Sequence, residues 1–176
     1  MTDSPVDQLA KALDQAEQAL DTVRDDNLDS PTPCADWSVR QLAAHLASSP
    51  ARFAQMGRGE EVDWAADPGV PDGEWPQAFR AGADELLGQL RDLPEDKQGG
   101  AGFATAEFAV HGWDLAHGTD ADIAWDDSVA ETALAAMQQG LTDETRGDAF
   151  GAEVAVPADA GAYDRLAAFA GRDPQA

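Results

Sequence analysis

The sequence predicts an all-α protein, built as a four-helix bundle with short additional helices at its C-terminal end. Three observations lead to this prediction. Ala and Leu dominate the apolar residues while Val and Ile are sparse, which favours helix over sheet. Four long stretches repeat apolar residues at helical spacing, and most are joined by short connections, as such a bundle requires. No repeat of roughly 30 to 45 residues occurs, so an α-solenoid is not expected.

The first helix is expected within residues 5–26. Its apolar positions form one stripe, made of Val6, Leu9, Ala10, Leu13, Ala16, Leu20 and Val23. Two prolines among Asp, Ser and Thr at residues 29–36 then predict a turn. Ser38 is a candidate N-cap for the second helix, which we expect from about Val39 to Met56, with Pro50 marking a kink or a break.

A surface loop is expected at residues 57–73, which are rich in Gly, Pro and acidic residues and lack a period. The third helix follows the apolar stripe from Trp75 to Leu90 and ends before Pro94. After a Gly-rich connection, the fourth helix is expected at 103–117, because the glycine that follows suits a left-handed C-cap.

The last third of the chain contributes two shorter helices. Residues 126–128 supply cap residues for a fifth helix at about 129–139, and a short helix is expected at 162–170. Residues 150–156 are extended at most, because they alternate only weakly and end at a proline. With 176 residues the chain has the usual size of one domain, so residues 1–176 are expected to form a single domain.

The charge balance argues against several partners. The chain carries 34 acidic and 11 basic residues, a net charge of -23. Nucleic acid is not an expected partner, because neutralising phosphates requires clustered Lys and Arg. The acidic, lysine-poor composition fits either a halophilic source or a high-GC genome. No segment is apolar enough to span a membrane and residues 1–14 lack a secretion signal, so no membrane partner and a cytoplasmic location are expected.

Three residues on two predicted helices form a candidate metal site. Glu107 and His111 lie one turn apart on the same side of the fourth helix, and His45 lies at the edge of the apolar stripe of the second. A buried carboxylate needs a neutralising partner, and residues 103–117 contain neither Lys nor Arg. One divalent cation held by the three side chains would satisfy this need and leave positions for water or substrate. The alternative from spacing alone is that Glu107 faces water and both histidines are half-buried.

Two sequence motifs and the C-terminal tail resemble a known family. Residues 32–46 read TPCADWSVRQLAAHL and resemble the TPCxxWxVRxLxxHL signature of the mycothiol-dependent maleylpyruvate isomerase family, which belongs to the DinB-like metal-binding bundles. Residues 107–116 read EFAVHGWDLA and are similar to its second signature, ExxVHGWDLA. The tail, from Phe150 to Pro174, resembles an actinobacterial subfamily of uncharacterised members. The resemblance therefore covers nearly the full length.

The resemblance implies a DinB-like bundle in which His45, Glu107 and His111 ligate one divalent ion. Zinc is the first choice, and Ni, Mn and Fe(II) suit the same ligands. Asp114 either accepts a hydrogen bond from the second ring nitrogen of His111 or is a solvated acid at the helix end. His117 falls on a different face and is left out of the site.

Other residues of the motifs have simpler interpretations. Cys34 is the only cysteine, so no intramolecular disulfide can form, and its place in a Pro-rich turn favours a small packed residue over a nucleophile or ligand. Trp37 and Trp113 are interpreted as core anchors. Arg40 is expected to pair with a nearby acid, and the neighbouring acids at 60–61 are expected to face solvent.

The leading functional hypothesis is a metal-dependent enzyme of small-molecule thiol chemistry, a transferase or isomerase in which the cation lowers the pKa of a low-molecular-weight thiol. The isomerase itself carries a further C-terminal domain that this sequence does not contain, so maleylpyruvate isomerisation is not expected. Two alternatives remain: a hydrolase that uses metal-activated water, and a non-enzymatic module that binds metal or a small ligand. DinB-like bundles are often dimeric, which makes a homodimer compatible with the resemblance.

Overall fold

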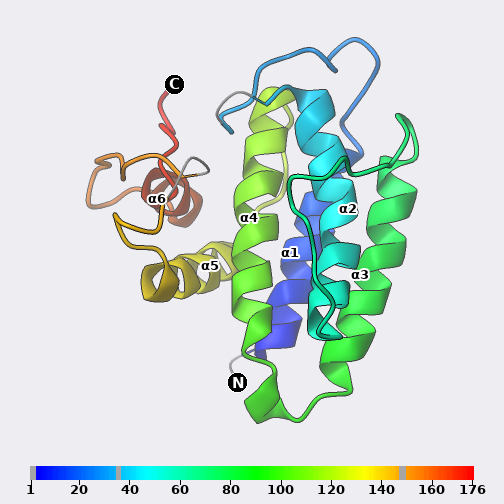
Figure 1. The fold of residues 1–176 in the computed structure, drawn as a ribbon. Coiled ribbons are helices and arrows are strands. Elements are labelled where there is room, and N and C mark those ends of the chain that lie inside the picture. The colour runs from blue at the N-terminus through cyan, green and yellow to red at the C-terminus, as the bar shows by residue number, and fades with distance from the viewer. Residues whose placement is uncertain (1–2, 35–36, 147–149) are drawn as a thin grey trace.

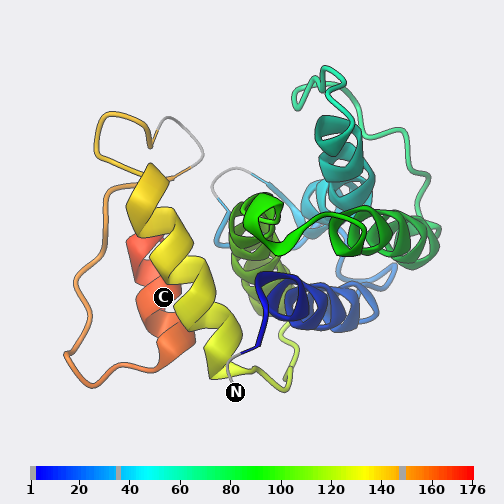
Figure 2. The same ribbon diagram turned by 90° about the horizontal axis from the view of Figure 1, so that it is seen from below.

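The computed structural model describes residues 3–34, 37–146 and 150–176, and over these ranges the chain is helical without any β-strand. Four helices form the bundle: α1 (Pro5–Leu20), α2 (Val39–Gly57), α3 (Trp75–Arg91) and α4 (Gly100–Gly118). The segment between α2 and α3 crosses back along the length of the bundle, so these two helices run in the same direction (Figure 1). Viewed along the bundle, α1 and α2 lie diagonally opposite, each between α3 and α4 (Figure 2). The predicted all-α bundle is confirmed.

The first helix is shorter than predicted, because side chains replace helical hydrogen bonds after Leu20. The hydroxyl of Thr22 donates to the carbonyl of Ala19 at 2.6 Å, and the side-chain amide of Asn27 donates to the carbonyl of Thr22 at 3.1 Å. Such local bonds compete with helix continuation. Val23 belongs to the predicted stripe and still packs against the core, although it lies outside the helix.

The second helix begins as predicted, because Ser38 caps it in a reciprocal capping box with Gln41. Pro50 does not break it. Pro50 lacks an N–H, and the helix approaches α3 closely at this point: a Cβ added to Gly82 of α3 would lie 2.7 Å from the backbone nitrogen of Ala51. This close contact fixes the C-terminal half of α2 against α3.

The remaining helices differ from the prediction only at their ends. The Gly-rich connection contributes the first turn of α4, after a short 3-10 helix (Glu95–Lys97). Helix α5 (Asp127–Gly140) is capped by the side chain of Asp126, and α6 (Ala162–Phe169) completes the described structure. These two helices lie side by side next to α4, on the side away from α3 (Figure 2).

Helix α4 is therefore covered by helices on both sides. Helices α1 and α2 flank it within the bundle, and α5 and α6 flank it outside. A buried glycine, Gly112, allows this packing, because a Cβ there would lie 3.3 Å from the Cα of Ala16 in α1. None of the helices in the described part of the chain is long and apolar enough to cross a membrane.

Candidate metal centre

The three predicted ligands converge between α2 and α4. The Nε2 atom of His45 lies 2.7 Å from Oε1 of Glu107, and Nε2 of His111 lies 3.6 Å from the same oxygen. One donor atom from each residue lies within 4.8 Å of the other two. The three side chains are only 12, 16 and 11% exposed, in the order His45, Glu107 and His111. The fold thus gathers two imidazoles and a carboxylate into one nearly buried cluster.

The chemistry and spacing of these donors fit a divalent cation. With bonds of about 2.0–2.1 Å in a tetrahedral site, neighbouring donors lie about 3.4 Å apart. The two separations, 2.7 Å and 3.6 Å, lie on either side of that value. The shorter one is a hydrogen bond between the His45 ring and the carboxylate. An ion bound to both atoms would replace this hydrogen bond.

The charges in the cluster are strongly coupled. Burial alone would raise the pKa of Glu107, but the charge of His111 and the hydrogen bond from His45 lower it to about 2. Burial would likewise lower the pKa of His111, but Glu107, Asp114 and Cys34 raise it well above its usual value. A protonated imidazole therefore neutralises the buried carboxylate when no cation is bound. A divalent ion can take the place of that proton, since metal binding and proton release are linked.

Asp114 orients His111 from behind and is itself held by Arg172. Its carboxylate is fully buried, and Oδ2 lies 3.2 Å from Nδ1 of His111. Arg172 donates to both carboxylate oxygens, from Nε at 3.1 Å and from Nη2 at 3.0 Å. With Nδ1–H directed at Asp114, Nε2 is the ring nitrogen that faces Glu107 and would bind an ion in place of its proton. The interpretation of Asp114 as a solvated acid is therefore wrong.

A second group of potential ligands shares His111. Cys34, His111 and Asp114 also bring their donor atoms within 4.8 Å of one another, and all three are buried. The thiol is packed, as predicted, but it packs against the imidazole rather than in a simple apolar environment. A cation in this group would lie beside the guanidinium of Arg172, which already occupies both oxygens of Asp114. Charge repulsion therefore favours the cluster of His45, Glu107 and His111.

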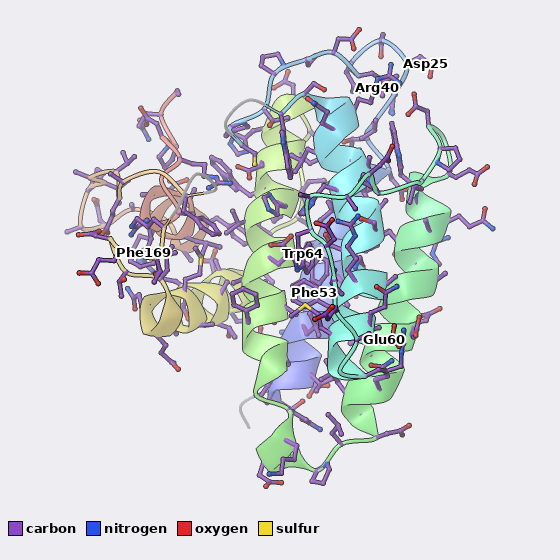
Figure 3. All side chains as sticks on the ribbon, in the orientation of Figure 1. Asp25, Arg40, Phe53, Glu60, Trp64 and Phe169 are labelled. Atoms are coloured by element: carbon purple, nitrogen blue, oxygen red, sulfur yellow. The ribbon has the colours of Figure 1, made fainter. Side chains whose placement is uncertain are left out.

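Two tryptophans border the cluster. The Trp37 ring centroid lies 4.8 Å from that of His45 and 6.1 Å from that of His111, so this half-buried residue contacts the site as well as the core. Trp64, from the predicted surface loop, lies 6.1 Å from the His45 ring and 5.3 Å from the Phe53 ring (Figure 3). The guanidinium of Arg52 donates to the carbonyl of Trp64 at 3.3 Å and holds the loop there. The sequence signal for this contact was that Trp64 is an isolated aromatic residue in a polar loop.

The other residues singled out in the sequence lie away from the cluster. Trp113 is buried as expected, and the exposed His117 lies against it, with the two rings tilted and their centroids 3.7 Å apart. Arg40 forms an ion pair with Asp72, and the acids at 60–61 are exposed. Residues 35–36 of the first signature lie outside the described residues. Sequence reasoning missed the role of Arg172, whose only signal was its place in the C-terminal tail motif.

Comparison with known proteins assigns the chain to a family. The family model described as the mycothiol maleylpyruvate isomerase N-terminal domain matches residues 9–116, which include His45, Glu107 and His111. Two uncharacterised proteins of Mycobacterium tuberculosis, from strains CDC 1551 and H37Rv, are each 32% identical over 179 residues, covering 92% of this chain and 94% of theirs. No solved structure matches the chain. With a family match over more than half of its length and relatives that align almost end to end, the chain belongs to the mycothiol maleylpyruvate isomerase N-terminal domain family.

Proposed function

We propose that the protein is a metal-dependent enzyme that acts on small molecules, with one divalent ion held by His45, Glu107 and His111. The observation that carries this proposal is the convergence of a carboxylate and two imidazoles in one buried cluster. The family name, which refers to mycothiol and to an isomerase, supports a thiol-dependent transferase or isomerase. Zinc is the first candidate for the ion, since it commonly binds two His and one Glu in catalytic sites.

The residues of this chain would each contribute to such a reaction. Glu107 supplies the negative charge that offsets the ion, and Asp114 fixes the His111 ring so that Nε2 faces the cluster. Trp37 and Trp64 place aromatic rings with centroids 4.8 and 6.1 Å from that of His45, at the border of the site. A bound ion would act as a Lewis acid and lower the pKa of a coordinated thiol, which favours thiolate attack on an electrophile.

Hydrolysis by metal-activated water is less well supported. It would need a general base near the cluster, and among the described residues Asp114 is a nearby carboxylate that is not itself a proposed ligand. Burial would raise the pKa of Asp114, but the bonds from His111 and Arg172 outweigh this effect and lower it. A carboxylate with a lowered pKa that is bound by a guanidinium is a poor proton acceptor. Thiol-dependent chemistry is therefore the better proposal.

Elemental analysis of protein purified without a metal-chelating tag tests the ligand assignment. We expect about one equivalent of a divalent metal in the wild type and in His117→Ala, and a loss of most of it in His111→Ala. His117 is the matched control because it is a histidine of the same helix that lies outside the cluster. Equal metal content in His111→Ala and the wild type would exclude the assignment.

A kinetic assay separates the reaction classes. The metal-loaded protein is mixed with 1-chloro-2,4-dinitrobenzene as a test electrophile, with and without a low-molecular-weight thiol. We expect loss of the electrophile to be accelerated only when the thiol and the metal are both present, because the proposed chemistry uses a thiolate. Acceleration that needs the metal but not the thiol would instead support the hydrolase.

A further inference from the structure

A cavity of about 230 Å³ adjoins the candidate metal centre between α4 and α5. Two of the proposed ligands, Glu107 and His111, form part of its wall on the α4 side. Ala136 and Met137 of α5 form the facing wall, and Phe150 closes it from the segment that follows α5. The cavity, which lies between these two helices, thus adjoins the buried cluster directly.

The described part of the cavity wall is mostly apolar. Among the described residues that line it, Glu107 and His111 carry the only ionisable side chains, and Thr145 carries the only other polar one. The remaining side chains are aromatic or aliphatic, such as Phe103, Val110 and Leu141. A phosphate, sulfate or carboxylate group would find no Lys or Arg among these residues, and a sugar would leave most of its hydroxyls without partners. The wall therefore favours an uncharged apolar group.

Polar contacts outside the cavity hold its outer wall in place. The guanidinium of Arg172 lies 5.6 Å from the ring centroid of Phe150. Arg146, which is nearly buried, donates to the carbonyls of Gly151 at 3.0 Å and Phe169 at 2.6 Å. Its guanidinium also lies 4.9 Å from the ring centroid of Phe169, which Figure 3 labels beside α6. These contacts tie the segment after α5 to α6 and so hold the outer wall of the cavity.

The volume sets the size of the group. An apolar cavity of about 150 Å³ is large enough to hold benzene. The cavity beside α4 is about 230 Å³ and so has room for one ring with a short substituent. Met137 adds tolerance to the shape of that ring, because its unbranched side chain adapts to irregular neighbours.

We propose that this cavity binds an uncharged, apolar, ring-sized group of the substrate and places the polar, reacting end of that substrate at Glu107 and His111. The placement of the reacting end rests on the proposed metal-dependent function. The binding of the ring rests on the lining and the volume of the cavity alone. Cyclohexanol and myo-inositol are suitable probes, because they share a six-membered carbon ring and differ in the number of hydroxyl groups.

Saturation-transfer NMR with these two probes tests the inference, on the protein as purified and after removal of metal by a chelator. We expect transfer to cyclohexanol and little to myo-inositol. Ala136→Phe should weaken cyclohexanol binding about tenfold or more, because the new ring fills the cavity. Ala135→Phe is the matched control, since it places the same side chain on the exposed neighbouring position of α5. Gly140→Leu is a second filling variant, because Gly140 also lines the cavity and no atom lies within 4 Å of the position of its Cβ, so the added side chain has room there.

The outcomes separate this inference from the proposed function. Equal transfer to both probes, or cyclohexanol binding that survives in Ala136→Phe and Gly140→Leu with their helical circular dichroism intact, would overturn the inference. Metal bound through His111 in a protein that binds no cyclohexanol would leave the proposed function standing and reject the inference alone. Cyclohexanol bound in the cavity of a protein whose metal content is unaffected by His111→Ala would reject the ligand assignment and keep the apolar subsite.

Discussion

At the scale of single residues, the orientation of the proposed ligand His111 depends on side chains that are not themselves proposed ligands. Its Nε2 faces Glu107, and its Nδ1 faces Asp114, which is bound in turn by Arg172. The buried Asp114 depends on that guanidinium, because a charged group without a partner is costly in the interior. The orientation of a proposed metal ligand therefore rests on a residue near the end of the chain.

Removing the guanidinium of Arg172 should be strongly destabilising. We expect Arg172→Met to lower the free energy of unfolding by about 3–5 kcal/mol, because it breaks a buried ion pair and removes the guanidinium that binds both oxygens of Asp114. Urea denaturation followed by circular dichroism measures the change. Arg165→Met is the matched control: Arg165 is 40% exposed and its ion pair with Glu131 spans 3.9 Å, so we expect a change below about 1 kcal/mol. Similar losses in the two variants would show that the buried pair has no special role.

At the scale of helices, the position of His45 depends on how closely α2 approaches its neighbours. Ser38 and Gln41 define where α2 begins, and the contact of Ala51 with Gly82 fixes its C-terminal half against α3. Two parallel helices can approach this closely only where one of them lacks a side chain. The small residue in α3 therefore supports the placement of a ligand in α2.

Two glycines of α3 should respond oppositely to the same substitution. Gly82→Ala should destabilise the protein by about 1–3 kcal/mol, because the added Cβ would lie 2.7 Å from the Ala51 nitrogen and force the helices apart. Gly88→Ala should stabilise it by about 0.5–1 kcal/mol, since nothing lies within 4 Å of that Cβ and Ala is the better helix former. Urea denaturation of both variants measures the difference. Equal effects would mean that the contact between α2 and α3 is not tight.

At the scale of the whole molecule, the net charge of -23 acts on stability. Lysine and arginine are too few to pair with most of the acids, so like charges repel one another over the surface of the folded chain. Salt reduces this repulsion, because the screening length falls from about 30 Å at 0.01 M to about 3 Å at 1 M. The local ion pairs described above are too sparse to offset the effect.

The melting temperature should therefore rise as NaCl increases from about 0.01 to 1 M. Differential scanning calorimetry in a non-chelating buffer measures it. A variant with Asp84→Asn, Glu95→Gln and Asp159→Asn removes three exposed charges, and we expect its melting temperature to be higher at low salt and to depend less on salt. A melting temperature that is constant or falls with salt would show that self-repulsion is not significant.

Much of the architecture could be predicted from local patterns. The start of α2 at Ser38 followed from its capping residue, and the end of α3 followed from Pro94, because both features act within a few residues. The end of α1 was missed, since the bonds made by Thr22 and Asn27 compete with a stripe that continues to Val23. The pairing of Glu107 with His111 could be predicted from their spacing. Their approach to His45 was expected from the resemblance, and the fold shows it by placing α2 beside α4.

The sequence by itself determined the helices, their apolar faces and the pairing of Glu107 with His111, because these depend on the 3.6-residue period and on neighbouring side chains. Only the tertiary structure brought Trp64 to the His45 ring, Arg172 to Asp114 and the wall of α5 to the side of α4. These contacts join residues far apart along the chain, and they arise from the packing of helices into one another. No local pattern encodes that packing, since it depends on which apolar faces meet in the folded chain.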